Sequence, residues 1–230
     1  NIHSGGGSLL PSPPAEAVVR LGAEAAFCFD GDGDRVIAVD EKGRVVDGDM
    51  LLYILAAAGK KKGKDVGVVV GTSHTNMGVE KALDGIGVRL LRADIGDKYV
   101  REMMEQSGAA LGGEQSGDIN MKDFCGTGDG VLTAVAVSGL IKHKRLSLLA
   151  DAKLYPQVNL DIVVADKMMV INHEELWKTA AEIGRETGGR ILVRASGTEP
   201  KIRIMAECLG EEKCRAAAER LAEAVRNIRR

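Results

Sequence analysis

Hydrophobic residues in the first two thirds of the chain fall into short runs that glycine, aspartate and lysine interrupt. Runs rich in β-branched or aromatic residues predict strands, and apolar positions that recur every three or four residues predict helices. The expected strands lie at residues 26–29, 36–39, 66–70 and 88–91. The expected helices lie at residues 15–21, 50–58, 79–83, 98–106 and 128–141. This alternation predicts an α/β fold, in which the continuous run at 66–70 suits a buried parallel strand.

The pattern changes after Tyr155 and Pro156, where a second group of elements begins. Strands are expected at residues 158–164, 191–194 and 202–206. A helix is expected from Asn172, in a capping arrangement with Glu175, to about residue 186. The last helix, at 211–228, has a single apolar stripe, formed by Cys214, Ala218, Leu221, Val225 and Ile228. The order β-α-β-β-α predicts a small α+β C-terminal domain.

Composition excludes several classes of partner. A net charge of −2 and an aromatic content of 3% predict no nucleic-acid partner, and the basic run at 142–145 is expected to be a solvated helix end. No apolar run approaches the roughly 20 residues of a membrane helix, so no membrane partner is expected. The four cysteines lack CxxC spacing, which favours reduced thiols in a cytoplasmic protein over a zinc site.

Three carboxylates alternate with two glycines at Asp30, Asp32 and Asp34, and Arg35 follows directly. Carboxylates this close repel one another unless a cation lies among them, and glycine allows the loop to curl them toward one point. Hard oxygen ligands suit Mg²⁺ or Ca²⁺, and a guanidinium beside the metal can hold an anion. The pattern predicts a metal site between two strands, with phosphate chemistry.

Two other interpretations of this loop stay open. An EF-hand-like calcium loop would use the three aspartates and then Glu41 as its bidentate ligand. That loop, however, needs glycine where Arg35 stands, and it needs helices where the flanking runs predict strands. The other interpretation is an acidic turn with only a structural role.

Two further loops carry groups that suit a phosphosugar. Residues 194–200, with Arg203 beyond them, offer guanidinium, hydroxyl and glycine amide groups for a phosphate, although Ser-Gly-Thr is also common in turns. Within residues 112–118, Glu114 and Ser116 lie two positions apart. An extended loop would place both on one side, toward neighbouring sugar hydroxyls.

Together and in this order, the three loops resemble those of the α-D-phosphohexomutase superfamily, and most closely its bacterial phosphoglucosamine mutase branch. Segments 113–117, 127–130 and 95–100 favour that branch. At the start of the chain, five residues fall in register with the second domain of its members: Asn1, Ile2, Gly7, Ser8 and Pro11.

Members of the family have four domains around a central cleft. The resemblance implies a partial α/β domain with the metal loop at 1–45 and a complete mixed-sheet α/β domain with the sugar loop at 46–153. A small α+β domain with the phosphate loop would follow at 154–230.

The resemblance also implies an isomerase of amino-sugar metabolism that supplies a peptidoglycan precursor. It would interconvert glucosamine 6-phosphate and glucosamine 1-phosphate through a phosphoserine, with glucosamine 1,6-bisphosphate as intermediate. Mg²⁺ would be held by Asp30, Asp32 and Asp34, with Arg35 as the catalytic group beside it. The sugar would contact Glu114, Ser116 and Asp118. The distal phosphate would contact Arg194, Ser196, Gly197, Thr198 and Arg203.

The resemblance spans the whole chain but only about the C-terminal half of such an enzyme. The phosphoserine loop is therefore expected to be absent, the N-terminal half to be a necessary partner, and the chain alone to be inactive. Ser73 lies in a superficially similar loop, but it follows a strand where the third domain has its own turn. The alternatives are a non-catalytic module that binds sugar phosphate or metal, and a fragment of a phosphoglucomutase or phosphomannomutase. The sequence does not specify the oligomeric state.

Three positions depart from the family's pattern. Asp118 stands where the sugar loop usually has histidine, Ala195 where the phosphate loop more often has proline, and Lys98 where arginine is usual. Lys98 keeps the charge but loses the fork of the guanidinium. Asp118 replaces a proton donor with an anion, which would repel a transferring phosphate.

Overall fold

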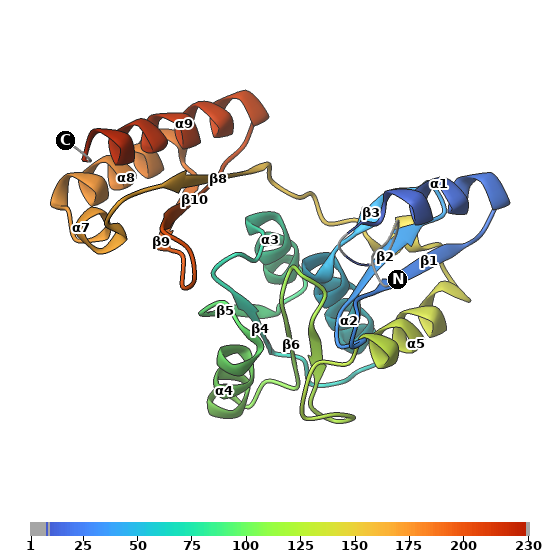
Figure 1. Ribbon diagram of the computed structural model, residues 1–230. Coiled ribbons are helices and arrows are strands. Elements are labelled where there is room, and N and C mark those ends of the chain that lie inside the picture. Colours follow the sequence, from blue (N-terminus) through green and yellow to red (C-terminus); the bar gives the residue numbers. More distant parts are fainter. Residues whose placement is uncertain (1–7, 9, 229–230) are drawn as a thin grey trace. The chain divides into compact units, whose positions relative to one another are not determined.

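Contacts within the chain separate it into two units, Asn1–Lys153 and Leu154–Arg230, in a computed structural model that describes residues 8 and 10–228 (Figure 1). Asn1, Ile2 and Gly7, three of the positions matched to the family's second domain, lie outside the described residues. The expected α/β class is confirmed, and the finer division at residue 45 stays a prediction. None of the helices that the structure describes is both long and apolar enough to span a bilayer.

A three-stranded antiparallel sheet begins the first unit, in the order β1-β2-β3. Its strands are β1 (Ala25–Phe29), β2 (Val36–Asp40) and β3 (Val45–Val46), and helix α1 (Ser12–Leu21) precedes them. Successive residues of β2 face opposite sides, because side chains alternate along a strand. Val39 packs with Val18 of α1, whereas Ala38 joins the main core of the unit. Residues 30–35, which carry the three aspartates and Arg35 and are called the acidic loop below, form the hairpin connection between β1 and β2.

A four-stranded mixed sheet follows, in the order β5-β4-β6-β7. Strand β4 (Val68–Thr72) is parallel to β5 (Arg89–Ala93) and β6 (Leu111–Gly113), and β7 (Ile119–Met121) is antiparallel to β6. The surrounding helices are α2 (Gly48–Lys61), α3 (Met77–Gly85), α4 (Asp97–Ser107), α5 (Gly130–Ile141) and the short α6 (Leu146–Leu149).

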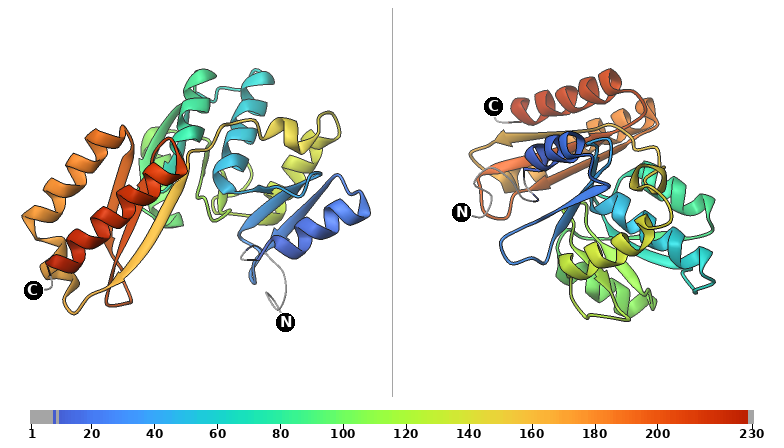
Figure 2. Two further views of the ribbon diagram at one scale, coloured as in Figure 1. Left: turned by 90° about the horizontal axis from the view of Figure 1, so that it is seen from above. Right: turned by 90° about the vertical axis from the view of Figure 1, so that its right-hand side faces the viewer.

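Helices cover both faces of this sheet (Figures 1 and 2). Val69 packs with residues of α2, α3 and α5, and its neighbour Val70 packs with residues of α4. Both valines are fully buried, which explains why this strand shows a continuous apolar run rather than alternation. The predicted strand at 66–70 is therefore confirmed as a buried parallel strand, displaced by two residues.

The second unit has a three-stranded antiparallel sheet in the order β8-β10-β9. Its elements are β8 (Gln157–Val163), α7 (Lys167–Ile171), α8 (Glu174–Thr187), β9 (Arg190–Ala195), β10 (Lys201–Glu207) and α9 (Glu211–Asn227). Helices α8 and α9 lie side by side on the sheet (Figure 2). The predicted stripe of α9 packs against Ile183 of α8 and Ile204 of β10.

The predicted helix start at Asn172 is wrong. Asn172 ends the unpredicted helix α7, and α8 begins at Glu174 with no side-chain hydrogen bond at its N-cap. Asp166 explains α7, because its carboxylate accepts hydrogen bonds from the backbone N–H groups of Met168 and Met169. The short elements β3, β6, β7 and α6 were also not predicted.

Candidate functional site

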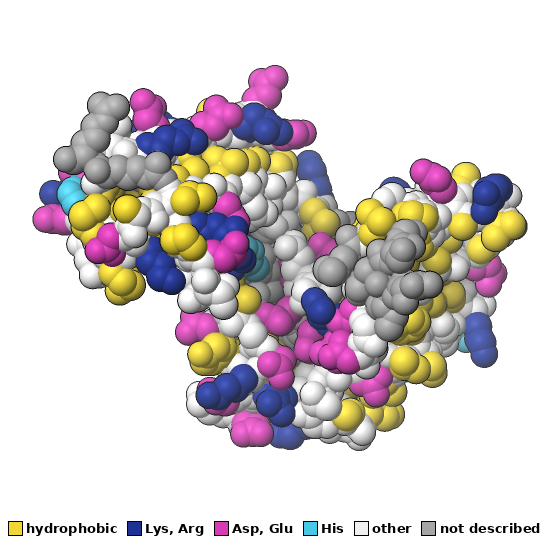
Figure 3. Space-filling view, viewed as in Figure 1, with side chains coloured by type: hydrophobic (Ala, Val, Ile, Leu, Met, Phe, Trp, Pro, Cys, Tyr) yellow, Lys and Arg dark blue, Asp and Glu magenta, His cyan; other side chains and the backbone are white. Residues whose placement is uncertain are grey.

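The acidic loop brings its three carboxylates together. One ligand atom each from Asp30, Asp32 and Asp34 lies within 4.8 Å of the others. Gly33 has a φ of +77°, a conformation that L side chains rarely adopt, so glycine allows the curl of the loop. The space-filling view shows acidic side chains gathered on this unit (Figure 3).

Arg35 partly compensates this cluster. Its Nε donates to Asp30 Oδ2 at 2.5 Å and lies 3.6 Å from Asp34 Oδ1. Burial alone would raise the pKa of Asp30, but the hydrogen bonds from Arg35 outweigh it and leave that pKa below its ordinary value. For Asp34, burial and the neighbouring Asp30 and Asp32 raise the pKa. One arginine therefore does not satisfy three carboxylates.

The donor set fits a hard divalent cation. Asp34 Oδ1 is buried and accepts no hydrogen bond from the residues that the structure describes, although the side chain as a whole is 45% exposed. A buried carboxylate oxygen that accepts no hydrogen bond is costly unless a cation or proton compensates it, and Arg35 Nε, 3.6 Å away, does so only in part. Beside Asp30 and the exposed Asp32, that oxygen has the chemistry of an Mg²⁺ or Ca²⁺ ligand.

The EF-hand interpretation is wrong. The acidic loop joins two paired strands rather than helices, with Phe29 opposite Val36. Glu41, which would have been the bidentate ligand, instead accepts hydrogen bonds from the backbone N–H and the hydroxyl of Ser147. These contacts hold Glu41 on the turn after β2, at the opposite end of that strand from the acidic loop.

The Glu114–Ser116 segment is a tight turn between β6 and β7, so the expectation of an extended loop is wrong. The Glu114 N–H donates to the Asp118 carbonyl at 2.8 Å, and the Gly117 N–H donates to the Glu114 carbonyl at 3.0 Å. Gly117 has a φ of +98°, and a Cβ there would lie 2.2 Å from the Val36 carbonyl oxygen. The turn therefore needs glycine at 117, for conformation and for space.

Glu114 and Ser116 differ in their surroundings within this turn. Glu114 Oε1 accepts a hydrogen bond from the Gly96 N–H at 2.9 Å, and burial raises the pKa of Glu114. Ser116 is exposed. Lys98, one of the three departures from the family's pattern, lies nearby at the start of α4. It is exposed, and its Nζ lies 3.8 Å from Glu102 Oε1. The turn therefore presents one held carboxylate and one accessible hydroxyl.

Backbone contacts fix the acidic loop to this turn. Arg35 and Asp118 form an isolated antiparallel bridge, and the Val36 N–H donates to the Gly117 carbonyl at 3.0 Å. The Gly130 N–H at the start of α5 donates to the Gly33 carbonyl at 3.1 Å. The predicted metal ligands and the predicted sugar contacts thus belong to one framework within the first unit.

Asp118 lies inside this framework rather than on its surface. It is 8% exposed, and a Cβ on Gly128 would lie 2.3 Å from its Oδ1. Burial, followed by repulsion from Glu114, Asp97 and Asp34, raises the pKa of Asp118 to about 6. The Asp118 carboxylate therefore packs against the backbone of Gly128, where any larger side chain would clash with it.

Asp49, which was not predicted, holds the loop after β4. It is fully buried in the first turn of α2, and its Oδ2 accepts a hydrogen bond from the Asn76 N–H at 2.9 Å. Asn76 in turn caps α3 by accepting from the Gly78 N–H. Ser73 lies in this loop, and its N–H donates to the Ala93 carbonyl of the neighbouring strand. The Asp47-Gly48-Asp49 run at a helix start was a sequence signal for this position.

The predicted phosphate loop connects β9 and β10 in the second unit. Arg194 lies opposite Arg203 in the ladder. The Nε atoms of both arginines are buried and donate no hydrogen bond to any residue that the structure describes, although Arg203 forms ion pairs with Asp161 and Glu199. Burial, and then repulsion from Arg203, lowers the pKa of Arg194. Two neighbouring guanidinium groups with unused donors are suited to an anion.

The rest of this loop is arranged around buried Ser196. The Ser196 hydroxyl accepts a hydrogen bond from the Glu199 N–H at 3.3 Å, while Gly197 and Thr198 are exposed. Lys167 of α7, which was not predicted, donates from Nζ to the Ser196 carbonyl at 2.6 Å. Lys167 lies beside Ser196 because α7 packs against β9 and β10. No local sequence pattern indicated this packing.

Comparisons with known proteins agree on one family. The family model "Phosphoglucomutase/phosphomannomutase, alpha/beta/alpha domain III" matches residues 47–157, and the model of the family's C-terminal domain matches residues 147–227. Phosphoglucosamine mutase of Geobacillus kaustophilus is 47% identical over 98% of this chain, and that of Geobacillus thermodenitrificans is 46% identical over the same share. The chain spans about half the length of these relatives, 52% of each.

A solved structure shares the fold. The N-acetylphosphoglucosamine mutase of Aspergillus fumigatus, in complex with GlcNAc-6P and magnesium, superposes with a TM-score of 0.76 at 18% identity. The superposition covers 90% of this chain and 49% of that protein. At this identity the likeness supports the fold alone.

Proposed function

The chain belongs to the phosphoglucomutase/phosphomannomutase family, and on that basis we propose that it provides the C-terminal part of a mutase that interconverts glucosamine 6-phosphate and glucosamine 1-phosphate. The observation that carries the proposal is the framework in which the Arg35–Asp118 bridge joins the acidic loop to the Glu114 turn. A phosphoryl-transfer site needs metal and substrate contacts held at fixed relative positions. The names of the relatives support glucosamine as the sugar.

The acidic loop has the metal-binding role in this proposal. Asp30, Asp32 and Asp34 would hold Mg²⁺, which when bound would neutralise charge that develops on the transferring phosphoryl group. Arg35 would keep Nε on Asp30 and use its terminal nitrogens to hold an oxygen of the same phosphoryl group.

The remaining site residues bind and orient the sugar phosphate. Glu114 and Ser116 would hydrogen-bond sugar hydroxyls, and Asp118 would support them from within the turn. The distal phosphate would be anchored by the β9–β10 loop, through Arg194, Ser196, Gly197, Thr198 and Arg203. Arg194 is suited to this role because its buried Nε donates no hydrogen bond to any of the described residues. Arg203, which also pairs with Glu199 and Asp161, has a buried Nε that donates no hydrogen bond within the same residues.

The reaction also needs a group that stores the phosphoryl group between its two transfers. In the proposed cycle a phosphoserine outside this chain gives its phosphoryl group to the free sugar hydroxyl, which yields glucosamine 1,6-bisphosphate. The bisphosphate then reverses its orientation in the site. The serine hydroxyl accepts the other phosphoryl group, and the product keeps the newly transferred one. Because the storing group lies outside this chain, the chain would act together with the other half of such an enzyme. The expected compartment of that enzyme is the cytoplasm.

Calorimetry with the purified chain tests the binding part of this proposal. In the presence of Mg²⁺, glucosamine 6-phosphate should bind more tightly than glucose 6-phosphate or mannose 6-phosphate, and Arg194→Lys should weaken all three. Binding of all three sugars with equal affinity would remove the assignment to glucosamine. No binding to any of them would contradict the proposed sites.

A further inference from the structure

The end of the first unit opposite the Glu114 turn carries a groove between helices α2 and α5. Strands β4 and β6 begin at this end, since Val66 and Ala110, which precede them, line the groove. It consists of two adjoining cavities of about 220 and 500 Å³, which share Ala58, Lys62 and Leu140. The larger cavity is within the ~300–1,000 Å³ range of small-molecule sites.

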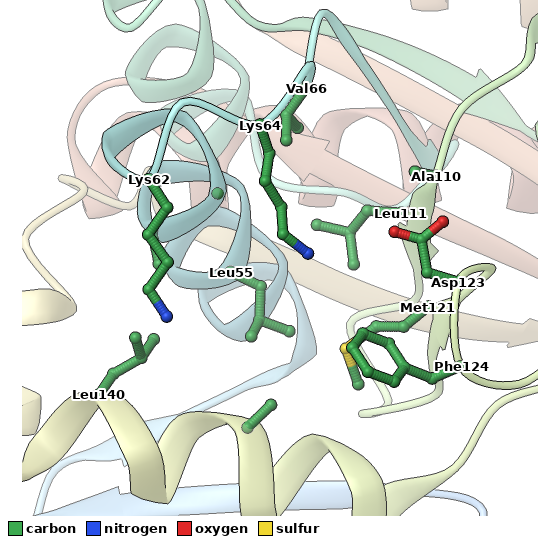
Figure 4. A pocket seen from close by; sticks show the side chains of 13 residues that line it. Leu55, Lys62, Lys64, Val66, Ala110, Leu111, Met121, Asp123, Phe124 and Leu140 are labelled. Carbon is green, nitrogen blue, oxygen red and sulfur yellow. The ribbon is translucent and has the colours of Figure 1, made fainter.

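The floor of the groove is apolar. In the smaller cavity, Leu55 and Leu111 point into the space between α2 and the end of β7, beside Met121 (Figure 4). Ile54 and Leu149 line the larger cavity. A floor of this kind favours a ligand with an apolar body, because burial of each methylene tightens binding about fourfold.

The rim of the groove is basic. Lysine side chains come from the end of α2 and from the segment after α5, as Lys61, Lys62, Lys64 and Lys144, and His143 lies beside Lys144. Two carboxylates line the same groove, Asp123 and Asp151, and Asp151 Oδ1 accepts a hydrogen bond from the Tyr53 hydroxyl at 2.9 Å. Across residues 8 and 10–228, none of the four rim lysines takes part in an ion pair.

Helix ends explain only part of this arrangement. Lysines near a helix C-terminus interact favourably with the macrodipole, which accounts for basic residues after α2 and α5. It does not account for an apolar cavity beneath them. Figure 4 shows the side chains of Lys62 and Lys64 extending over the smaller cavity from the segment that follows α2. Lys64 Nζ lies 5.8 Å from the centre of the exposed Phe124 ring. Positive charge above an apolar floor is complementary to an anion with an apolar chain.

We propose that this groove binds a single-chain anionic amphiphile, a medium-chain alkyl carboxylate. Its head group would lie among Lys61, Lys62 and Lys144, and its chain would pass Leu140 into the cavity of Leu55 and Leu111. None of the residues that line the groove belongs to the proposed metal, sugar or phosphate sites, so the inference does not depend on the proposed function.

A methyl-detected NMR titration of the whole chain with decanoate below its micelle concentration tests the inference. Decanoate should shift the methyl signals of Leu55, Leu111, Leu140 and Met121 in a saturable way. Hexanoate, four methylenes shorter, should bind on the order of 100-fold more weakly, since each methylene is worth about fourfold. Decyltrimethylammonium, with the same chain and the opposite charge, should bind at least tenfold more weakly than decanoate.

A matched pair of charge reversals separates the groove from general surface charge. Lys62→Glu should weaken decanoate binding at least tenfold, and Lys42→Glu, on the turn after β2, should change it less than twofold. Equal effects of the two variants, shifts outside the groove, or no saturable binding would overturn the inference. Binding to phosphatidylglycerol vesicles without binding to monomeric decanoate would also overturn it, in favour of a membrane surface.

Discussion

The backbones of Arg35 and Asp118 pair in an isolated antiparallel bridge, although 82 residues separate them in sequence. The bridge continues through the Val36 N–H, which donates to the Gly117 carbonyl at 3.0 Å. The acidic loop therefore does not move independently of the turn that carries Glu114 and Ser116. A change at one of these two sites is expected to reach the other through the backbone.

Substitution of Gly117 tests this connection. Gly117→Ala should destabilise the first unit by about 2–4 kcal/mol, because its Cβ would clash with the Val36 carbonyl and its φ of +98° is unfavourable for alanine. Urea unfolding followed by far-ultraviolet circular dichroism measures the change. Trp177 fluorescence reports only on the second unit and should not change. The control Gly85→Ala, in a helix with open space around it, should be neutral or slightly stabilising. Equal stability of the two variants would contradict the close approach.

The acidic loop should bind Mg²⁺. Asp32→Asn should weaken binding at least tenfold, since it removes one of three carboxylate ligands without disturbing a buried group. Asp84→Asn, an exposed aspartate at the end of α3, is the matched control and should leave the affinity unchanged. Isothermal calorimetry gives both values. If the two variants bind Mg²⁺ alike, the metal assignment fails.

Arg194 should contribute more to phosphate binding than its charge alone. Arg194→Lys keeps the charge but loses the fork of donors, so glucosamine 6-phosphate should bind about tenfold more weakly or worse. Arg215→Lys, an exposed arginine on α9, provides the control. Calorimetry that finds equal affinities for the two variants would rule out the anchoring role.

Asp49 should make the first unit less stable as pH rises. Burial, and then repulsion from Asp47, raises the pKa of Asp49 from its ordinary value of 3.8 to about 7 in the folded protein. Between these values the folded state retains a proton that the unfolded state has lost, so the free energy of unfolding falls as pH increases. Above about pH 7 Asp49 is ionised in both the folded and the unfolded state, so its effect on the free energy of unfolding no longer changes with pH.

Asp49→Asn isolates this effect. Its amide oxygen can still accept from the Asn76 N–H, but it cannot ionise. The stability of the variant relative to the native chain should rise by about 2–4 kcal/mol between pH 4 and pH 8. Urea unfolding at several pH values measures this difference. A difference that does not vary with pH would show that Asp49 is ionised at a normal pKa.

The sequence predicted those elements whose evidence is local. The short apolar runs at β1, β2, β4 and β5 and the periodic runs at α2 and α9 were sufficient to identify strands and helices. The carboxylates of the acidic loop were predicted to converge for the same reason, because their spacing and their glycines lie within one short segment.

The features that sequence did not indicate depend on contacts between distant segments. Residue 117 must be glycine because the Val36 carbonyl lies against it, and Asp118 has room because residue 128 is glycine. No local pattern around residues 117 and 118 includes Val36 or Gly128. The position of Lys167 beside Ser196 depends on α7, a single turn that begins at the Asp166 cap. The extended geometry expected for Glu114 and Ser116 failed because β6 and β7 pair closely enough to force a turn.

A chimera tests the proposed mutase function. This chain would replace the matching half of the Geobacillus kaustophilus phosphoglucosamine mutase, to which it is 47% identical. With Mg²⁺ and catalytic glucosamine 1,6-bisphosphate, the chimera should convert glucosamine 6-phosphate to glucosamine 1-phosphate. The same chimera with Asp32→Asn, and the chain on its own, should not. A folded chimera without turnover, or turnover that survives Asp32→Asn, would contradict the proposed function.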